Sequence, residues 1–352
     1  MTITDTPAEV SLAAAYAAMH AGAAFVCAPP RMPLPSDIAD GHLAVVSSGS
    51  TGSPRYIVRT WASWQDSFAV IDERLAVRPG EVVGLAGPIW STMMLFAALH
   101  ALDSDAVPLI GLDPRAPDTQ GTVDVIHAVP TIAFDLIEAI ELGHRSAPRL
   151  LVTAGATCPR ALWDRTEAAG VPMVEYFGAA ETSIIGWRSQ PGAFDLVPGV
   201  EVDIRDGLIW VRSPYLAAGY LGADDGPLRR DGEWVSVADR GHLDVDGRLH
   251  VHGRGDEAVT TAGHTVVTAD VEAVLLQVPG VEQLAVVGVP HERYGEILVA
   301  VYSGSVDTSV LRAAARALPS PARPRAWVQQ DSLPRLGTGK LDRAAIREVA
   351  RS

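Results

Sequence analysis

The chain has 352 residues, 48% of them hydrophobic, so it can bury a large core and is expected to form at least two domains. Its 28 Lys and Arg against 42 Asp and Glu give a net charge of −14, which argues against nucleic acid or an anionic membrane as a bulk partner. Two cysteines, Cys27 and Cys158, are too few for a disulfide framework or a cysteine-rich metal site. The N-terminal segment lacks the basic start of a signal peptide, so a cytoplasmic location is predicted.

The first 250 residues alternate short apolar runs with helix-like stretches. Strands are predicted at residues 25–27, 42–46, 82–85, 107–110, 150–152 and 174–177, and helices at 62–75, 92–102, 134–142 and 159–169. The uncharged stretch 82–102 contains Gly84, Gly87 and Pro88, which favours a strand, loop and helix over a membrane span. This alternation predicts a large α/β domain of layered sheets.

The pattern changes near residue 199 to short β segments, which predict a small β subdomain. Hairpins are expected to turn at Asp206-Gly207 and at Asp246-Gly247. After residue 254, a helix at 269–277, a strand at 284–289, a helix at 309–317 and a basic tail predict a smaller α+β unit. The expected domains are therefore 1–254 and 255–352.

One short loop, residues 47–55, combines glycines with hydroxyl side chains and ends on a cation. It leaves the predicted strand 42–46, where glycine would let backbone N–H groups approach a polyphosphate. No Gly-Lys-Ser/Thr follows at the Walker A spacing, and a Ser/Gly-rich surface turn is the alternative on local grounds. The residues that would contact phosphate are Ser47, Ser48, Gly49, Ser50, Thr51, Gly52 and Arg55.

This loop resembles the phosphate loop of the AMP-forming ligases, which include acyl-CoA synthetases, adenylation domains of peptide synthetases and luciferases. Their pattern is roughly Ser-Gly-Ser/Thr-Thr-Gly-x-Pro-Lys-Gly, so Arg55 stands for the lysine and Tyr56 for the last glycine. The resemblance implies that the loop holds the β- and γ-phosphates of ATP. It also implies a mobile C-terminal domain.

A second segment, residues 175–182, is similar to the Tyr-Gly-x-Thr-Glu motif of the same family. The resemblance implies that an aromatic ring, at Tyr176 or Phe177, stacks on adenine next to Gly178, and that Glu181 binds Mg²⁺. Ala180 stands where many members have threonine. The preceding strand and glycine turn, residues 150–159, resemble the segment that supports adenine, with Gly155 and Ala156 nearest to it.

Three later segments continue the resemblance in the family's order. Asp239 matches the aspartate that holds the ribose hydroxyls, and a carboxylate facing two hydroxyls makes a good bidentate fit. In Gly253-Arg254-Gly255-Asp256, Arg254 would reach the nucleotide and Asp256 would be the hinge. Residues 333–343 match the C-terminal lysine segment, which implies that Lys340 is catalytic at the α-phosphate and the carboxylate. Each segment alone could be a turn or a basic tail; their order argues against chance.

The acid pocket is expected around residues 87–94. No acidic side chain is present there to bind an α-amine, which argues against an α-amino acid as substrate. Trp90 and Met94 would form an apolar wall suited to an aryl or alkyl acid, with Ser91 and Ala179 beside them, although core packing explains Trp90 and Met94 equally well. Ser91 stands where CoA ligases often carry histidine.

The resemblance implies ATP-dependent formation of an acyl-adenylate and transfer of the acyl group to a thiol, with ATP, Mg²⁺ and coenzyme A as cofactors. Transfer to a carrier-protein phosphopantetheine or to an amine, and a nucleotide-binding pseudoenzyme, are the alternatives. The phosphate loop begins unusually early, as in short o-succinylbenzoate–CoA ligases, which indicates a shortened N-terminal part. A homo-oligomer could cover the sheet face exposed by such shortening.

Overall fold

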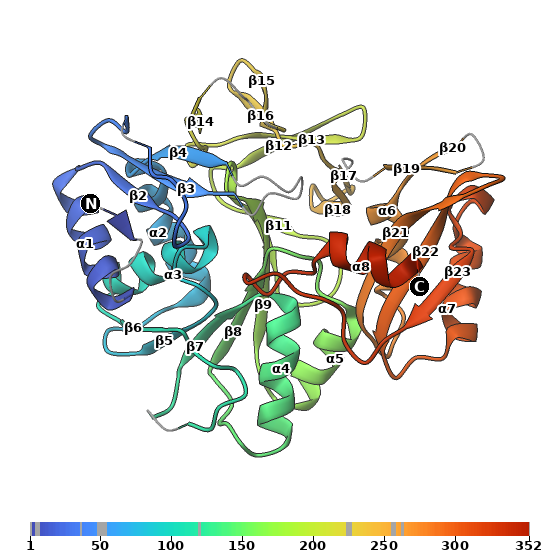
Figure 1. Cartoon of the computed structure of the whole chain (residues 1–352). Coiled ribbons are helices and arrows are strands. Elements are labelled where there is room, and N and C mark those ends of the chain that lie inside the picture. The colour runs from blue at the N-terminus through green and yellow to red at the C-terminus, as the bar shows by residue number, and fades with distance from the viewer. Residues whose placement is uncertain are drawn as a thin grey trace.

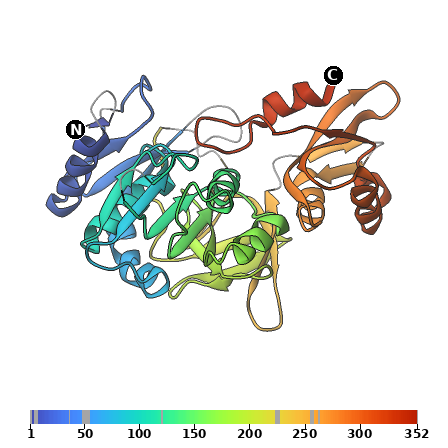
Figure 2. The same cartoon turned by 90° about the horizontal axis from the view of Figure 1, so that it is seen from below.

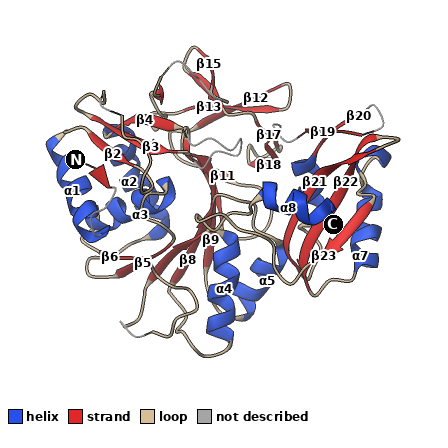
Figure 3. Ribbon diagram, in the orientation of Figure 1, coloured by secondary structure: helices blue, strands red, loops and turns tan. Residues whose placement is uncertain are grey.

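The structure is a computed structural model that describes residues 2–3, 8–35, 37–47, 55–118, 121–222, 227–254, 258–261 and 264–351. Three sheets form the N-terminal part, and a fourth sheet with its helices forms a separate C-terminal unit beside it (Figure 1). Figure 3 shows helices packed beside the first, second and fourth sheets. The mixed α/β fold predicted from the sequence is therefore confirmed.

The first sheet has the strand order β1-β2-β3-β4-β14. Strands β3 and β4 pair antiparallel, with Val46 opposite Tyr56, so the segment between them is a connection at one end of the sheet. Helices α1 and α2 pack their apolar side chains into the same core as this sheet. The elements are β1 (Thr2–Ile3), α1 (Ala8–Ala21), β2 (Phe25–Cys27), β3 (His42–Val46), β4 (Tyr56–Thr60), α2 (Ala62–Leu75) and β14 (Gly219–Tyr220).

The second sheet has seven strands in the order β11-β10-β9-β8-β7-β5-β6, and its strands β5 to β9 run parallel. Side chains of one face join α2 and α3 in the main core, and those of the other face pack on α4 and α5. The strands are β5 (Val82–Ala86), β6 (Val107–Ile110), β7 (Val125–Ala128), β8 (Leu150–Ala154), β9 (Met173–Ala179), β10 (Ser183–Arg188) and β11 (Asp195–Leu196). The helices are α3 (Thr92–Asp103), α4 (Pro130–Glu141) and α5 (Arg160–Ala168).

Helix α4 begins four residues before the predicted start at 134. Pro130 occupies the first helical position, where its fixed φ suits a helix and its missing N–H costs nothing. The other predicted elements of this part lie within two residues of the observed bounds.

The third sheet is the predicted β subdomain. Both expected hairpins are present, joining β12 to β13 through Asp206-Gly207 and β17 to β18 through the turn that contains Asp246-Gly247. The strands are β12 (Glu201–Arg205), β13 (Leu208–Arg212), β15 (Arg229–Asp231), β16 (Trp234–Ser236), β17 (Asp239–Leu243) and β18 (Leu249–Arg254).

The C-terminal unit is built on a long antiparallel pair, β21 and β22, which the view from below shows beside the N-terminal part (Figure 2). The predicted basic tail is instead largely the helix α8, because its Ile346 packs against a small core under this sheet. The strands are β19 (Ala258–Thr261), β20 (His264–Val267), β21 (Val281–His291), β22 (Gly295–Gly304) and β23 (Ala326–Gln329). The helices are α6 (Thr268–Leu275), α7 (Thr308–Ala314), two short 3₁₀ turns at Ala315–Ala317 and Ser320–Ala322, and α8 (Arg343–Arg351).

Within the described ranges, none of the helices has the length and apolar character that crossing a membrane requires.

Candidate active site

Most of the predicted site segments meet at one edge of the second sheet, where its parallel strands end. Strand β5 leads to Ser91, β8 leads to Gly155, and the segment to Glu181 follows the end of β9. The carboxyl ends of parallel strands are where open α/β sheets bind ligands. The topology therefore gathers segments that lie about 90 residues apart in the sequence at one edge.

The base of the loop 47–55 lies at the same edge. The backbone N–H of Ser47 donates to the carbonyl of Arg55 at 2.9 Å, and the backbone N–H of Arg55 donates to Ser47 Oγ at 3.3 Å. Thr92, at the start of α3, donates its hydroxyl to the Val46 carbonyl at 3.3 Å, which fixes the loop base beside that helix. The predicted phosphate contacts at residues 48–52 lie outside the described residues.

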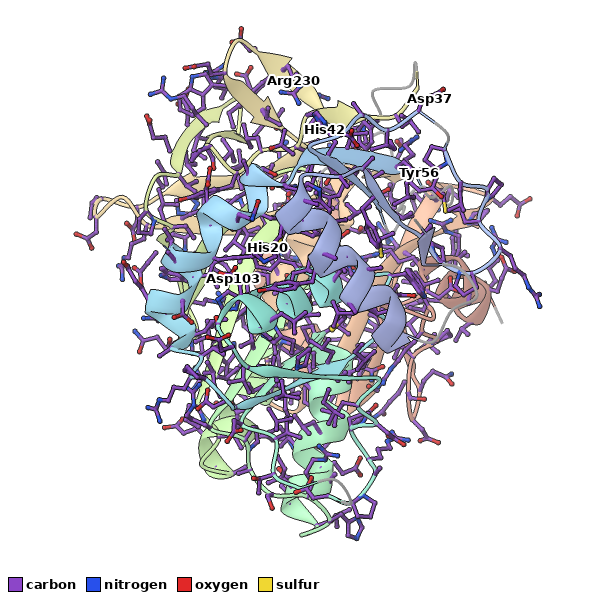
Figure 4. All side chains as sticks on the ribbon, turned by 90° about the vertical axis from the view of Figure 1, so that its left-hand side faces the viewer. His20, Asp37, His42, Tyr56, Asp103 and Arg230 are labelled. Carbon is purple, nitrogen blue, oxygen red and sulfur yellow. The ribbon has the colours of Figure 1, made fainter. Side chains whose placement is uncertain are left out.

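Tyr56, which replaces a family glycine, has a structural contact. Its phenol donates to the carbonyl of Pro33 at 2.8 Å, and burial raises the pKa of Tyr56. Figure 4 shows Tyr56 and Asp37 at the same end of the first sheet, with His42 at the other end of the β3–β4 pair. Tyr56 thus ties the segment before β3 to the strand that follows the loop.

Glu181, the predicted magnesium ligand, is buried and held in place. It is only 6% exposed, and Tyr220 donates its hydroxyl to Glu181 Oε1 at 2.6 Å. Its carboxylate also lies in the field of the Arg59 guanidinium. Hard carboxylate oxygens suit Mg²⁺, which proteins commonly bind through one or two carboxylates together with substrate phosphates. Across the described parts of the chain, no group of three or more His, Cys, Asp and Glu could hold a metal without such phosphates.

Arg59 is a site residue that the sequence interpretation missed. Its guanidinium is fully buried and donates to the carbonyls of Ala180 and Tyr215, which lie on the two segments that carry Glu181 and lead to Tyr220. Burial lowers the pKa of Arg59 to about 9, and the nearby Glu181 opposes that shift. The sequence contained a signal for this position. Arg59 follows the apolar Ile57 by two residues on a strand, so both side chains lie on the same, buried face.

The structure separates the two aromatic candidates for adenine stacking. Successive strand residues point to opposite faces. Tyr176 lines a buried cavity between β9 and α3, whereas Phe177 contacts Phe194 with ring centroids 5.8 Å apart. Burial raises the pKa of Tyr176, so its hydroxyl stays protonated. Gly178 and Ala179 continue the strand toward Glu181.

Lys340 lies directly beside Gly155, although 185 residues separate them in the sequence. A Cβ placed on Gly155 would be 3.0 Å from Lys340 Cε and 3.4 Å from its Nζ. Ala156 follows Gly155 in the same turn and is exposed. In Figure 1 the red segment before α8 extends from the C-terminal unit to the centre of the molecule. The structure therefore joins the predicted lysine to the predicted adenine-supporting turn.

The lysine segment docks on the start of α4. Thr131 donates its hydroxyl to the carbonyl of Gly339, and Arg335 Nη1 lies 2.9 Å from Asp135 Oδ2. Gly339 has φ +83°, and a Cβ on it would lie 2.5 Å from Ile132 Cδ1. Only glycine adopts this backbone at such close approach without strain.

We expect Gly339→Ala to lower the rate of adenylate formation by about 10- to 100-fold, because overpacking and a strained φ cost about 1–3 kcal/mol. Steady-state pyrophosphate release measures the rate, and thermal unfolding checks the fold. Gly337→Ala is the matched control, since a Cβ there meets no atom within 4 Å and its φ is not positive. Equal rates in both variants would contradict the close docking of the lysine segment.

The two predicted ribose contacts belong to paired strands. Asp239 begins β17 and is the register partner of Arg254 at the end of β18. Asp239 is 7% exposed. Asp256, the predicted hinge, lies outside the described residues, so the hinge and the boundary at 254 stay predictions.

The residues expected to line the acid pocket have packing contacts in the structure. Ser91 caps α3 by accepting a hydrogen bond from the Met94 backbone N–H at 3.4 Å. Met94 is 2% exposed and packs against Gly87, while Trp90 is partly buried against the main core. Deeper between α3 and the sheet lies the narrow cavity that Tyr176 lines, together with His100 and His127.

Burial of His127 predicts loss of stability in acid. Burial lowers the pKa of His127 from its usual 6.5 to about 3. Below pH 6.5 the unfolded chain therefore takes up a proton that the folded chain excludes, and stability falls as the pH decreases toward 3. We expect His127→Phe to remove up to about 1.4 kcal/mol per pH unit of this slope in urea unfolding between pH 6.5 and 4. His144→Phe, at an exposed loop position, should keep the wild-type slope; identical slopes in all three proteins would contradict the prediction.

Two protein-family models match the chain. The model for AMP-binding enzymes matches residues 34–221, and the model for the AMP-binding enzyme C-terminal domain matches residues 270–340. The chain belongs to the AMP-binding enzyme family. The family and the class of enzyme predicted from the sequence, an AMP-forming ligase, are therefore confirmed.

Individual members of the AMP-binding enzyme family are moderately similar to the chain. An uncharacterized acyl–CoA ligase of Bacillus subtilis is 28% identical over 328 residues, which cover 86% of this chain and 67% of that protein. A 2-succinylbenzoate–CoA ligase of Lactococcus lactis is 22% identical over 337 residues, covering 89% and 73%. A crystal structure of ATP-bound MatB from Rhodopseudomonas palustris superposes with a TM-score of 0.74 at 25% identity, covering 87% and 67%. The chain thus spans about two thirds of the length of the relatives that it matches.

Proposed function

We propose that this protein activates a carboxylic acid with ATP to an acyl-adenylate and then transfers the acyl group to coenzyme A. The observation that carries the proposal is the position of Lys340 beside Gly155, at the strand ends where the nucleotide segments meet. Relatives named as acyl–CoA and 2-succinylbenzoate–CoA ligases support the same pair of reactions.

In the first reaction a carboxylate oxygen bonds to the α-phosphorus of ATP, and pyrophosphate leaves. Lys340 would place a point charge between the two anionic reactants, and its position at the strand ends pre-organises that charge. The loop that begins at Ser47 and ends at Arg55 would hold the β- and γ-phosphates. Phe177 would contact the adenine, and Asp239 with Arg254 would hold the ribose.

Glu181 would hold Mg²⁺ together with ATP phosphates, and the bound ion would neutralise phosphate charge. The chain's own contribution is to keep this carboxylate fixed, through Tyr220 and through the segment that Arg59 holds. In the second reaction the thiolate sulfur of coenzyme A bonds to the acyl carbon, and AMP leaves.

The acid is proposed to be an aryl or alkyl acid. Residues 87–94 carry no acidic side chain that could pair with an α-amine. Instead, the cavity between α3 and the sheet is lined mainly by apolar and aromatic side chains.

A pyrophosphate-release screen over aryl, alkyl and α-amino acids, with and without coenzyme A, tests the proposal. We expect release with an aryl or alkyl acid, followed by formation of the thioester and AMP. If pyrophosphate is released without formation of the coenzyme A thioester, and a carrier-protein phosphopantetheine or an amine is acylated, that group is the acceptor in place of coenzyme A. Binding of ATP without release for any acid would overturn the proposal in favour of a nucleotide-binding pseudoenzyme.

A further inference from the structure

The narrow cavity between the second sheet and the helices α2 and α3 has an unusual pair of polar groups. Its walls come from α2, α3, β7, β9 and β10 and are mostly apolar. The imidazoles of His100 on α3 and His127 on β7 both line it, and the two side chains are 2% and 3% exposed.

Three ring nitrogens of these two buried histidines lack hydrogen-bond partners in the part of the chain that the structure describes. Both ring nitrogens of His127, and Nε2 of His100, have none among the residues that the structure describes. The carboxylate nearest to His100 Nε2 belongs to Asp72, at 3.6 Å, beyond hydrogen-bond distance. Leaving a buried polar group unpaired costs about 1–3 kcal/mol. Three such nitrogens on one cavity therefore indicate that something else pairs with them.

Along the strands of the second sheet, the cavity lies before the strand ends at which Lys340 is placed. His127 is the register partner of Val152, and Tyr176 is the partner of Ala154, the residue before Gly155. Three residues along β8 thus separate the level of His127 from Gly155, which is about 10 Å of strand. A carboxylic acid of that length, held by its carboxylate at Lys340, would place its other end at His127.

We propose that the acid carries a hydroxyl or similar neutral group about 10 Å from its carboxylate, and that His127, with His100, hydrogen-bonds this group in the cavity. The inference rests on the proposed ligase function and narrows its substrate class from aryl or alkyl acids in general to those with a distal hydrogen-bonding group.

The chemistry of the cavity favours a neutral group over a charged one. Burial lowers the pKa of both histidines, so both rings are neutral. The His127 ring offers one donor and one acceptor, whereas His100 already hydrogen-bonds the Phe68 backbone and offers only its Nε2. A hydroxyl also donates and accepts, and can pair with both rings at once. A second carboxylate would be buried among apolar side chains and neutral rings, at a high desolvation cost. The space between the walls has room for about one water molecule, which suits a single small group.

The test compares acids that differ only at the distal position. The full chain is assayed for pyrophosphate release with 3-(4-hydroxyphenyl)propanoic acid, its 4-methyl analogue of similar size and its 4-carboxy analogue. We expect kcat/KM to be at least about 10-fold higher for the hydroxy acid than for either analogue. In His127→Phe the preference for hydroxyl over methyl should disappear, mainly through a higher KM for the hydroxy acid.

His144→Phe is the matched control and should keep the wild-type preference, because this exposed loop histidine is not among the residues that line the cavity. Ala97→Leu is a second variant that fills the cavity without changing either histidine, and it should also abolish the preference.

Equal kcat/KM for the hydroxy and methyl acids in the wild type would overturn the inference, and this result is expected if a structural water pairs with the histidines. A preference retained in both cavity variants would overturn it too. Activation of aryl acids in either case would leave the proposed function standing, whereas no activation of any acid would reject both.

Discussion

Lys340→Ala is expected to reduce acid-dependent pyrophosphate release by at least about 100-fold, the usual cost of removing one pre-organised charge from an active site. Lys340 is not one of the core residues, and its Nζ lies beside the exposed turn at Gly155, so the fold should survive. ATP binding should also survive, because the proposed phosphate and ribose contacts are untouched. Lys340→Arg should not restore the rate, since a planar guanidinium cannot replace a compact ammonium against Gly155. Undiminished release in Lys340→Ala would reject the assigned role.

A property of the composition makes this prediction unusually easy to check. Lys340 is the only lysine in the sequence, and the other 27 cationic side chains of the Lys and Arg total are arginine. Reductive methylation therefore modifies one side chain, with the N-terminal amine as an internal control. We expect Mg²⁺ and ATP to slow methylation of Lys340 several-fold and to leave the N-terminal amine unaffected. Equal protection of both amines would contradict a position beside the nucleotide.

Arg59→Met should lower the free energy of unfolding by about 3–5 kcal/mol, because it removes the cation from a fully buried site and leaves its partners unpaired. The carbonyls of Ala180 and Tyr215 would lose their donor, and Glu181 would lose the nearby charge. The same loss should raise the Mg²⁺ concentration needed for half-maximal pyrophosphate release, because Glu181 would no longer be held in position. Urea unfolding and a Mg²⁺ titration measure the two effects.

Two further variants test whether these effects are specific to Arg59 and do not follow from the loss of any arginine. Arg160→Met removes an exposed arginine paired with Asp164 at 2.7 Å and should change stability by no more than about 0.5 kcal/mol. Arg59→Lys keeps the charge but cannot donate to two carbonyls in a fixed fork, so it should fall between Arg59→Met and the wild type. Equal free energies of unfolding for Arg59→Met and Arg160→Met would show that the buried guanidinium does not stabilise the site.

Much of the architecture follows from local patterns in the sequence. The helix 62–75 and the strands 25–27 and 107–110 were predicted with the observed bounds, because apolar periodicity and flanking Gly or Pro mark them within a few residues. Helix α8 and strand β22 were not predicted. Helix α8 is rich in arginine, and its helical form depends on Ile346 packing against the neighbouring sheet. Strand β22 forms as the partner of β21.

The sequence by itself determined the family and the order of the site segments, from Ser47 through Glu181 and Asp239 to Lys340, because each motif is local in the chain. Only the tertiary structure decided which residues surround them. Arg59 and the Ala180 carbonyl are 121 residues apart, and Lys340 reaches Gly155 from the C-terminal part of the chain. The unpaired ring nitrogens of His100 and His127 also line one cavity only because the fold brings α3 and β7 together. Such contacts depend on strand order and burial, which no local pattern encodes, and they carry the substrate preference proposed above.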